Sequence, residues 1–94
     1  MEIKHKEVGS KGMFYIEHEG KTAAKMTYSI AGEDLIIIDH TEVDEVLKGK
    51  SAGAQMLGAA VAFARENNIK IIPLCPFAKS MFDKKTEYSD VLSS

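Results

Sequence analysis

Alternation of apolar and polar residues in the first third of the chain predicts β-strands joined by short turns. Residues 22–31 show it most clearly, because Met26 and Tyr28 share one face of an extended chain while Lys25 and Thr27 share the other. Glycine-containing turns should separate these strands. The predicted strands cover residues 3–8, 13–18, 22–31 and 35–43, with turns at residues 9–12, 19–20 and 32–34.

The fourth predicted strand differs from the others in its first half. Residues 35–38 read Leu-Ile-Ile-Ile, so apolar side chains point to both faces. Such a run is typical of a central strand with other elements packed on both sides. The strand becomes polar through Asp39 and Glu42 before it ends near Val43.

The second half of the chain predicts a helix, a strand and a second helix. Apolar residues at spacings of 3, 4 and 7 over residues 51–67 indicate a helix with one buried stripe. The β-branched run at 69–74 follows, and a strand–helix–strand unit of this length joins parallel strands. Pro73 cannot donate to a ladder, so the parallel strands should part there and leave a slot. The buried stripe is Gly53, Met56, Leu57, Ala60 and Ala64.

Cys75-Pro76 should begin the last helix, because proline favours the first helical position. The helix should run over residues 76–85, and a tail should dock through Tyr88, Val91 and Leu92. We therefore predict one α+β domain over residues 1–94. It has a mixed, mainly antiparallel sheet, a β-α-β crossover and a C-terminal helix.

Composition narrows the possible functions. The net charge of −2 argues against a general nucleic-acid binder, which needs a basic surface. No apolar run approaches the roughly 20 residues needed to span a bilayer, and no signal peptide is visible. The single cysteine, Cys75, forms no internal disulfide and favours a reducing, cytoplasmic compartment. We expect a monomer with no membrane or nucleic-acid partner. His5 and His18 lack the neighbours of a metal ligand set, so we predict no metal site.

The residues before the long helix have the chemistry of an anion site. Gly49, Ser51, Ala52 and Gly53 carry little or no side chain, so their peptide N–H groups can face a ligand directly. N–H groups in a first helical turn have no partner within the helix, and the macrodipole adds about half a positive charge there. With Lys48 and Lys50 nearby, the segment suits a phosphate or diphosphate. The alternative is an ordinary loop and helix start.

These features together resemble the catalytic core of the GNAT superfamily of acyl-CoA-dependent N-acetyltransferases. Lys48-Gly49-Lys50-Ser51-Ala52-Gly53 aligns with that superfamily's loop, Gln/Arg-x-x-Gly-x-Gly/Ala, with Ser51 replacing the first glycine. Thr41-Glu42-Val43 matches the T-x-V sequence that precedes the loop. Pro73-Leu74-Cys75-Pro76-Phe77, the later Glu87-Tyr88 pair and the short length resemble the minimal YjdJ-type subfamily. Lys85-Thr86 departs from the His-Pro that this subfamily often has.

The resemblance implies that the protein binds acetyl-CoA and transfers the acetyl group to an amine. The diphosphate would bind the N–H groups of residues 50–54, and the pantetheine arm would pair with residues 42–44. The thioester would then approach Cys75, His40 and Glu42. The implied cofactor-binding residues are Glu42, Val43, Asp44, Lys48, Gly49, Lys50, Ser51, Ala52, Gly53 and Ala54.

Catalysis would need a group that removes a proton from the acceptor amine, whose pKa is near 10.4 for a lysine. His40 and Glu42 lie two residues apart on a strand, so they share a face about 7 Å apart, with Asp39 opposite. Either residue can be a base, or both can be solvated strand-end residues.

Cys75 has three readings: a small core residue, a nucleophile at a helix N-terminus, or a passive lining of the thioester pocket. The acceptor is open between a protein lysine or N-terminus and a small amine. Two other functions stay open for the chain, a CoA-binding module with little or no activity and an interaction scaffold without a ligand.

Overall fold

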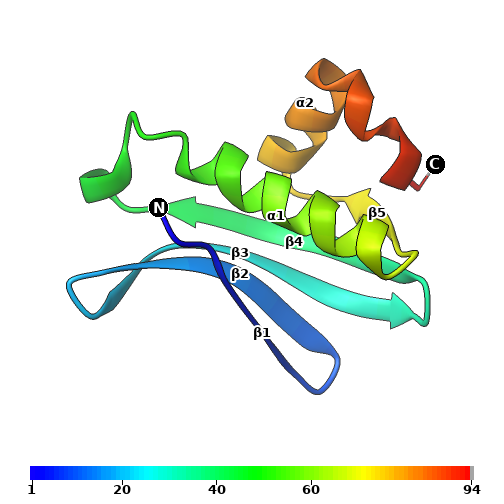
Figure 1. The fold of residues 1–94 in the computed structure, drawn as a ribbon, viewed down its shortest axis with the longest axis horizontal. Coiled ribbons are helices and arrows are strands. Elements are labelled where there is room, and N and C mark those ends of the chain that lie inside the picture. The colour runs from blue at the N-terminus through cyan, green and yellow to red at the C-terminus, as the bar shows by residue number, and fades with distance from the viewer. Residues whose placement is uncertain (94) are drawn as a thin grey trace.

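The computed structural model describes residues 1–93, which form a sheet of five strands with two α-helices and two 3-10 helices (Figure 1). The strand order is β1-β2-β3-β4-β5, antiparallel from β1 to β4, with β5 parallel to β4. This confirms the predicted fold class. The elements are β1 (Lys4–Val8), β2 (Lys11–His18), β3 (Lys21–Gly32), β4 (Leu35–Val43), η1 (Glu45–Leu47), α1 (Ala52–Glu66), β5 (Lys70–Pro73), α2 (Pro76–Lys84) and η2 (Thr86–Val91).

The hairpin between β2 and β3 follows from its two turn residues. Glu19 and Gly20 both have positive φ, 52° and 79°. Two consecutive residues with positive φ make the tight turn whose twist matches that of the flanking antiparallel strands. The turn pairs His18 with Lys21, and a one-residue register shift between Ile16 and Glu17 then brings Phe14 beside Met26.

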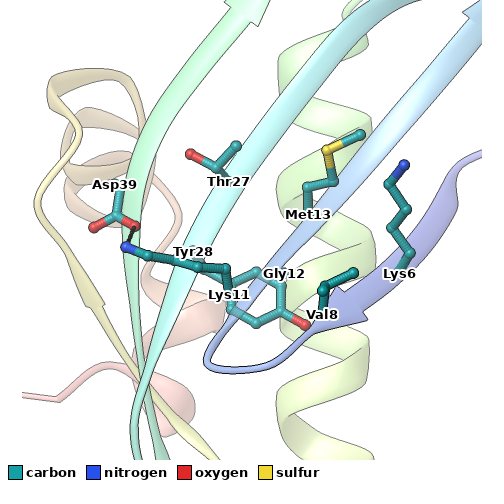
Figure 2. A pocket seen from close by; sticks show the side chains of 8 residues that line it. All are labelled: Lys6, Val8, Lys11, Gly12, Met13, Thr27, Tyr28 and Asp39. Carbon is teal, nitrogen blue, oxygen red and sulfur yellow. Dashed lines mark ion pairs between the residues drawn. The ribbon is translucent and has the colours of Figure 1, made fainter.

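The main core lies between the sheet and α1, whose predicted buried stripe is buried as expected. We call the sheet face against α1 the packed face and the opposite one the open face. Figure 2 looks onto the open face, with α1 behind the strands. On β4, Ile36 and Ile38 point to the packed face and are buried, whereas Leu35 and Ile37 point to the open face and are half-buried. The prediction that other elements pack on both faces of this strand is therefore wrong, because α1 covers one face only.

An aromatic cluster joins β1 to the rest of the packed face. The ring of Tyr28 crosses β2 at Gly12, where a Cβ would lie 2.7 Å from Cε1 of the ring and closer still to Cζ and Oη. The Tyr28 hydroxyl donates to Glu7 Oε2 at 2.6 Å and lies 2.5 Å from His5 Nε2. The His5 ring stacks on Phe14 with 4.1 Å between centroids. Gly12 is thus the position that lets Tyr28 reach the edge strand.

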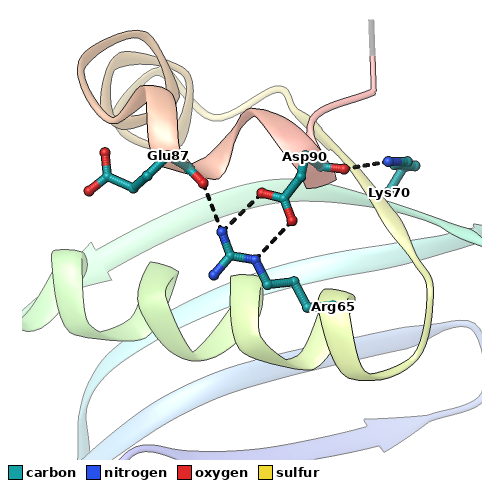
Figure 3. Close-up of polar contacts among 4 residues, drawn as sticks. All are labelled: Arg65, Lys70, Glu87 and Asp90. Carbon is teal, nitrogen blue, oxygen red and sulfur yellow. Dashed lines mark hydrogen bonds and ion pairs between the residues drawn. The ribbon is translucent and has the colours of Figure 1, made fainter.

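The C-terminal segment docks on α1 and on the outer edge of β5. Val91 is buried and Tyr88 is half-buried, as predicted for the tail, whereas Leu92 remains 36% exposed. Arg65 on α1 donates to both carboxylate oxygens of Asp90 at 2.9 Å and to the Glu87 carbonyl (Figure 3). This pairing holds the pKa of Asp90 below its ordinary value. The final residue, Ser94, lies outside the described residues.

Candidate active site

The pairing of β4 with β5 ends where the sequence predicts. Ile38 and Pro73 are the last paired residues, and the N–H groups of Leu74 and Cys75 both donate to the Ile38 carbonyl, at 3.1 and 3.2 Å. The chain then turns away into α2. Over residues 39–43, β4 continues without a β5 partner in the described chain. Proline ends the ladder because it has no N–H to donate.

The loop before α1 leaves peptide donors free, as an anion site requires. The helical hydrogen bonds begin with the Gln55 N–H, which donates to the Ser51 carbonyl at 2.9 Å. Within residues 1–93, no hydrogen bond engages the N–H groups of Ala52, Gly53 or Ala54. The N–H of Lys50 donates to the Leu47 carbonyl at 3.2 Å, so this member of the predicted donor set is already occupied.

Backbone conformation explains the residue types in this loop. Gly49 has a φ of 80° and Ser51 a φ of 59°, both in the left-handed region. A non-glycine residue is strained there by roughly 1–2 kcal/mol. Ser51 also makes no side-chain capping bond to α1 that would offset the strain. Ser51 therefore keeps a left-handed backbone conformation that serine does not favour.

Two lysines flank these donors. The Lys48 ammonium lies 3.2 Å from Glu45, and its side chain remains 64% exposed. An exposed pair of this kind contributes little and is readily exchanged for another anion. Lys50 forms no ion pair among the described residues. The loop thus combines free peptide donors, the positive end of a 15-residue helix and two accessible cations.

His40 and Glu42 lie on the open face. His40 Nε2 is 3.8 Å from Glu42 Oε1, and Lys25 Nζ is 3.4 Å from Glu42 Oε2. Both side chains are more than half exposed. Such a pair can accept or relay a proton.

Asp39 departs from the predicted alternation. Thr27 pairs with His40 and Tyr28 with Ile38, so Asp39 is an extra residue in a β-bulge. Its Oδ2 accepts from the Ser29 hydroxyl at 2.7 Å, on the open face. The prediction that Asp39 faces away from His40 and Glu42 is therefore wrong, because the bulge shifts the alternation by one residue.

Cys75 lies on the other side of β4, away from His40 and Glu42. Its thiol is buried, 3.2 Å from the hydroxyl of Thr41, and its Sγ accepts from the Ala78 N–H at the start of α2. Thr41 pairs with Met26 and so points to the packed face. The predicted catalytic residues therefore lie on two sides of β4, with His40 and Glu42 on the open face and Cys75 on the side of the packed face. Sequence reasoning missed Thr41 as the partner of the thiol, although its place between His40 and Glu42 assigns it to the opposite face.

The family model for GCN5-related N-acetyl-transferases matches residues 13–91. The chain belongs to the GCN5-related N-acetyltransferase family. It is therefore an enzyme domain of the class that transfers acetyl groups to amines. Among curated proteins, no sequence matches this acetyltransferase.

Solved structures agree with this assignment. An NMR structure of a GCN5-like proposed N-acetyltransferase from Staphylococcus aureus is 42% identical, covering 99% of this chain and 88% of that protein, with a TM-score of 0.75. A ribosomal-protein-alanine N-acetyltransferase from Brucella melitensis biovar Abortus 2308 is 14% identical, with a TM-score of 0.62 over 90% of this chain. A Clostridium acetobutylicum predicted acetyltransferase solved with acetyl-CoA is 17% identical, with a TM-score of 0.62 over 80% of this chain.

The last two proteins share the fold with this acetyltransferase, which spans 63% and 56% of their lengths. The φ of 59° at Ser51 is one that glycine adopts more readily than serine, which agrees with the glycine that the superfamily motif resembling this loop has at this position.

Two further properties of the described chain bear on its chemistry. In residues 1–93 of the acetyltransferase, no three His, Cys, Asp or Glu side chains gather as metal ligands would. Over the same residues, each helix is too short or too polar to cross a bilayer.

Proposed function

We propose that this acetyltransferase uses acetyl-CoA and binds its diphosphate at the N-terminus of α1. The observation that carries the proposal is the set of free N–H groups on Ala52, Gly53 and Ala54, beside Lys48 and Lys50. A diphosphate bound there gains charge-assisted hydrogen bonds from oriented donors and the attraction of the helix dipole. The structure of the Clostridium relative with acetyl-CoA supports the choice of cosubstrate.

The pantetheine arm would run along β4 where β5 no longer pairs with it. Its two amides can bond to an unpaired strand edge as a further strand would. Successive peptide groups of a strand point to opposite sides, and the Asp44 N–H already donates to Ala23 of β3 at 2.8 Å. Of the predicted segment 42–44, Val43 is therefore the favoured backbone partner, and Thr41 is the next one along the same edge.

The reaction we infer is direct transfer. The acceptor ammonium loses a proton, through water, to Glu42 or His40, and the neutral nitrogen attacks the thioester carbonyl. A C–N bond forms, the carbonyl π electrons move to oxygen, and collapse of this intermediate breaks the C–S bond. CoA leaves as a thiolate, and the proton that the attacking nitrogen loses to give the neutral amide is taken up by this thiolate. We place Glu42 first as the base and His40 second.

For Cys75 we propose a lining role rather than a nucleophilic one. Its thiol is buried and is occupied by Thr41 and the Ala78 N–H, which leaves little room for an attack on an incoming thioester. Cys75→Ser should keep most of the transfer rate, because a hydroxyl can still accept the helix-capping bond. A covalent acetyl group on Cys75, detected by mass spectrometry after rapid quench, would contradict this assignment.

Titration with CoA followed by backbone amide shifts tests the binding proposal. We expect the largest shifts at residues 51–54. The charge reversal Lys50→Glu should weaken CoA at least tenfold, about 1.4 kcal/mol. Lys21→Glu, an exposed lysine at the start of β3, is the matched control and should have little effect. Equal affinities for the two variants would refute binding at this loop.

A second candidate is a CoA-binding module with little turnover. The exposure of His40 and Glu42 favours it, since more than half of each side chain is open to water. Labelled acetyl-CoA with a panel of peptide and small amines separates the two functions. Transfer that falls at least tenfold in Glu42→Gln, with unchanged CoA affinity, supports the enzyme. Tight CoA binding without transfer to any amine supports the module.

A further inference from the structure

A groove of about 480 Å³ lies on the open face, across β1, β2 and β3 (Figure 2). Val8, Met13 and Gly12 give it an apolar lining, and Val8 is 77% exposed. Lys6 and Lys11 also line it, and Asp39 of β4 lies at its far side. Apolar side chains left in water on a sheet face mark a surface that a partner can cover.

The charges around this groove favour an anionic occupant. Within the described chain Lys6 has no carboxylate partner, and its ammonium lies 5.2 Å from the centroid of the Tyr15 ring. The Lys11 ammonium donates to the Ser29 hydroxyl at 2.7 Å and is 3.9 Å from Asp39, with 71% of its side chain exposed. An apolar floor beside the Lys6 ammonium, which has no carboxylate partner among the described residues, complements a carboxylate that neighbours an apolar side chain.

The groove adjoins the candidate catalytic residues. Thr27 lines the groove and pairs with His40, while Asp39 directly precedes His40 on β4. Asp39 and Glu42 are about 10 Å apart along the strand, at about 3.3 Å per residue. From β4 to β1 the sheet spans about 14 Å, at about 4.8 Å per strand. A small amine is too short to contact both the groove at β1 and Glu42 on β4, whereas about five residues of extended polypeptide can span that distance.

We propose that this groove docks an acidic, apolar segment of a polypeptide acceptor. The proposal rests on the proposed function, because it assumes that the acetylated amine lies near Glu42. The acceptor's carboxylate pairs with Lys6, its apolar side chain covers Val8 and Met13, and its lysine or N-terminal amine reaches the end of β4. The groove thereby selects an acceptor amine by the residues that lie about five positions from that amine in the acceptor's own sequence.

Three peptides of equal length test the proposal. Each carries one lysine, and five residues away it carries Asp-Leu, Ser-Ser or Arg-Leu. Amide shifts are followed without CoA, so docking is read independently of turnover. We expect the Asp-Leu peptide to shift Lys6, Val8 and Met13, and to bind at least about fivefold more tightly than the other two. Equal binding of all three, or shifts elsewhere only, would overturn the proposal.

Charge reversal gives the second measurement. Lys6→Glu should raise the KM of the Asp-Leu peptide about fivefold and improve binding of the Arg-Leu peptide, while kcat and CoA affinity stay unchanged. Lys21→Glu is again the control and should change neither peptide. If Lys6→Glu and Lys21→Glu behave alike, the docking site is refuted even where transfer occurs. If the Asp-Leu peptide docks at the groove without being acetylated, the docking site stands and the proposed reaction fails.

Discussion

The two faces of the sheet use the same strands for different purposes. On the packed face, Phe14, Met26 and Ile38 are each at most 3% exposed, beneath or beside α1. On the open face, Thr27 pairs with His40, and charged side chains stand in water. Burial of apolar surface against α1 supplies most of the driving force for folding. The open face is thereby free to carry the charges that binding and proton transfer require.

Among the substitutions that test this contrast, Gly12→Ala should have the largest effect on stability. The added methyl would overlap the Tyr28 ring, which is fully buried. We expect a loss of about 3 kcal/mol in the free energy of unfolding, measured by urea denaturation. Gly58→Ala is the matched control. Its Cβ would lie 3.6 Å from the Tyr88 hydroxyl, so it should gain about 0.5–1 kcal/mol from helix propensity. Similar losses in both variants would contradict the packing argument.

Tyr28→Phe is the next largest change. It keeps the ring but leaves Glu7 and His5 without the hydroxyl that joins them. We expect a loss of about 1–2 kcal/mol in unfolding free energy. Thr27→Val, on the adjacent open-face position, should stay within about 0.5 kcal/mol of the native protein. A larger loss in Thr27→Val than in Tyr28→Phe would reverse the ranking of the two faces.

Stability should also fall in mild acid because of His5. Burial against Phe14 and Phe63 lowers the pKa of His5 below its ordinary 6.5, and Glu7 offsets this only in part. The unfolded chain therefore binds the proton first, so stability decreases as pH falls from 6.5 toward the folded pKa. Urea denaturation at pH 7.5 and 5.5 should show the decrease in the native protein and a smaller one in His5→Phe. An equal decrease in both would assign the effect to other groups.

Lys25→Met should have the smallest effect. It removes the ion pair with Glu42, whose two side chains are 42% and 53% exposed. Exposed pairs contribute less than about 1 kcal/mol, so thermal denaturation should barely change. A loss above 2 kcal/mol would mean that the open face also holds the fold together.

Most of the fold could be predicted from local patterns, whereas parts of the site could not. The apolar stripe of α1 and the end of pairing at Pro73 follow from periodicity and from the missing proline N–H. The bulge at Asp39 depends on how β4 meets β3, so strict alternation assigned this residue to the wrong face. The burial of Cys75 beside Thr41 likewise depends on where α2 begins relative to β4.

Arg65 is a third residue whose contacts could not be predicted from the sequence. Its helical position indicates a solvated residue, and the side chain is indeed on the outer side of α1. Its bonds to Asp90 and Glu87 arise because η2 folds back across the helix. A single sequence does not reveal a contact made 25 residues away.

The tail that follows η2 has a consequence for self-assembly. Leu92 bridges Ile71, and the Ser93 N–H donates to the Ile71 carbonyl, so the chain covers the outer edge of β5 with its own backbone. In the described residues the bare margins of the sheet are then β1 and residues 39–43 of β4, and the pantetheine arm would cover the second of these. In two molecules that paired along β1, each β1 edge would be covered by the β1 of the other molecule. Association by strand addition thus stops at a two-fold pair and does not propagate into a fibre.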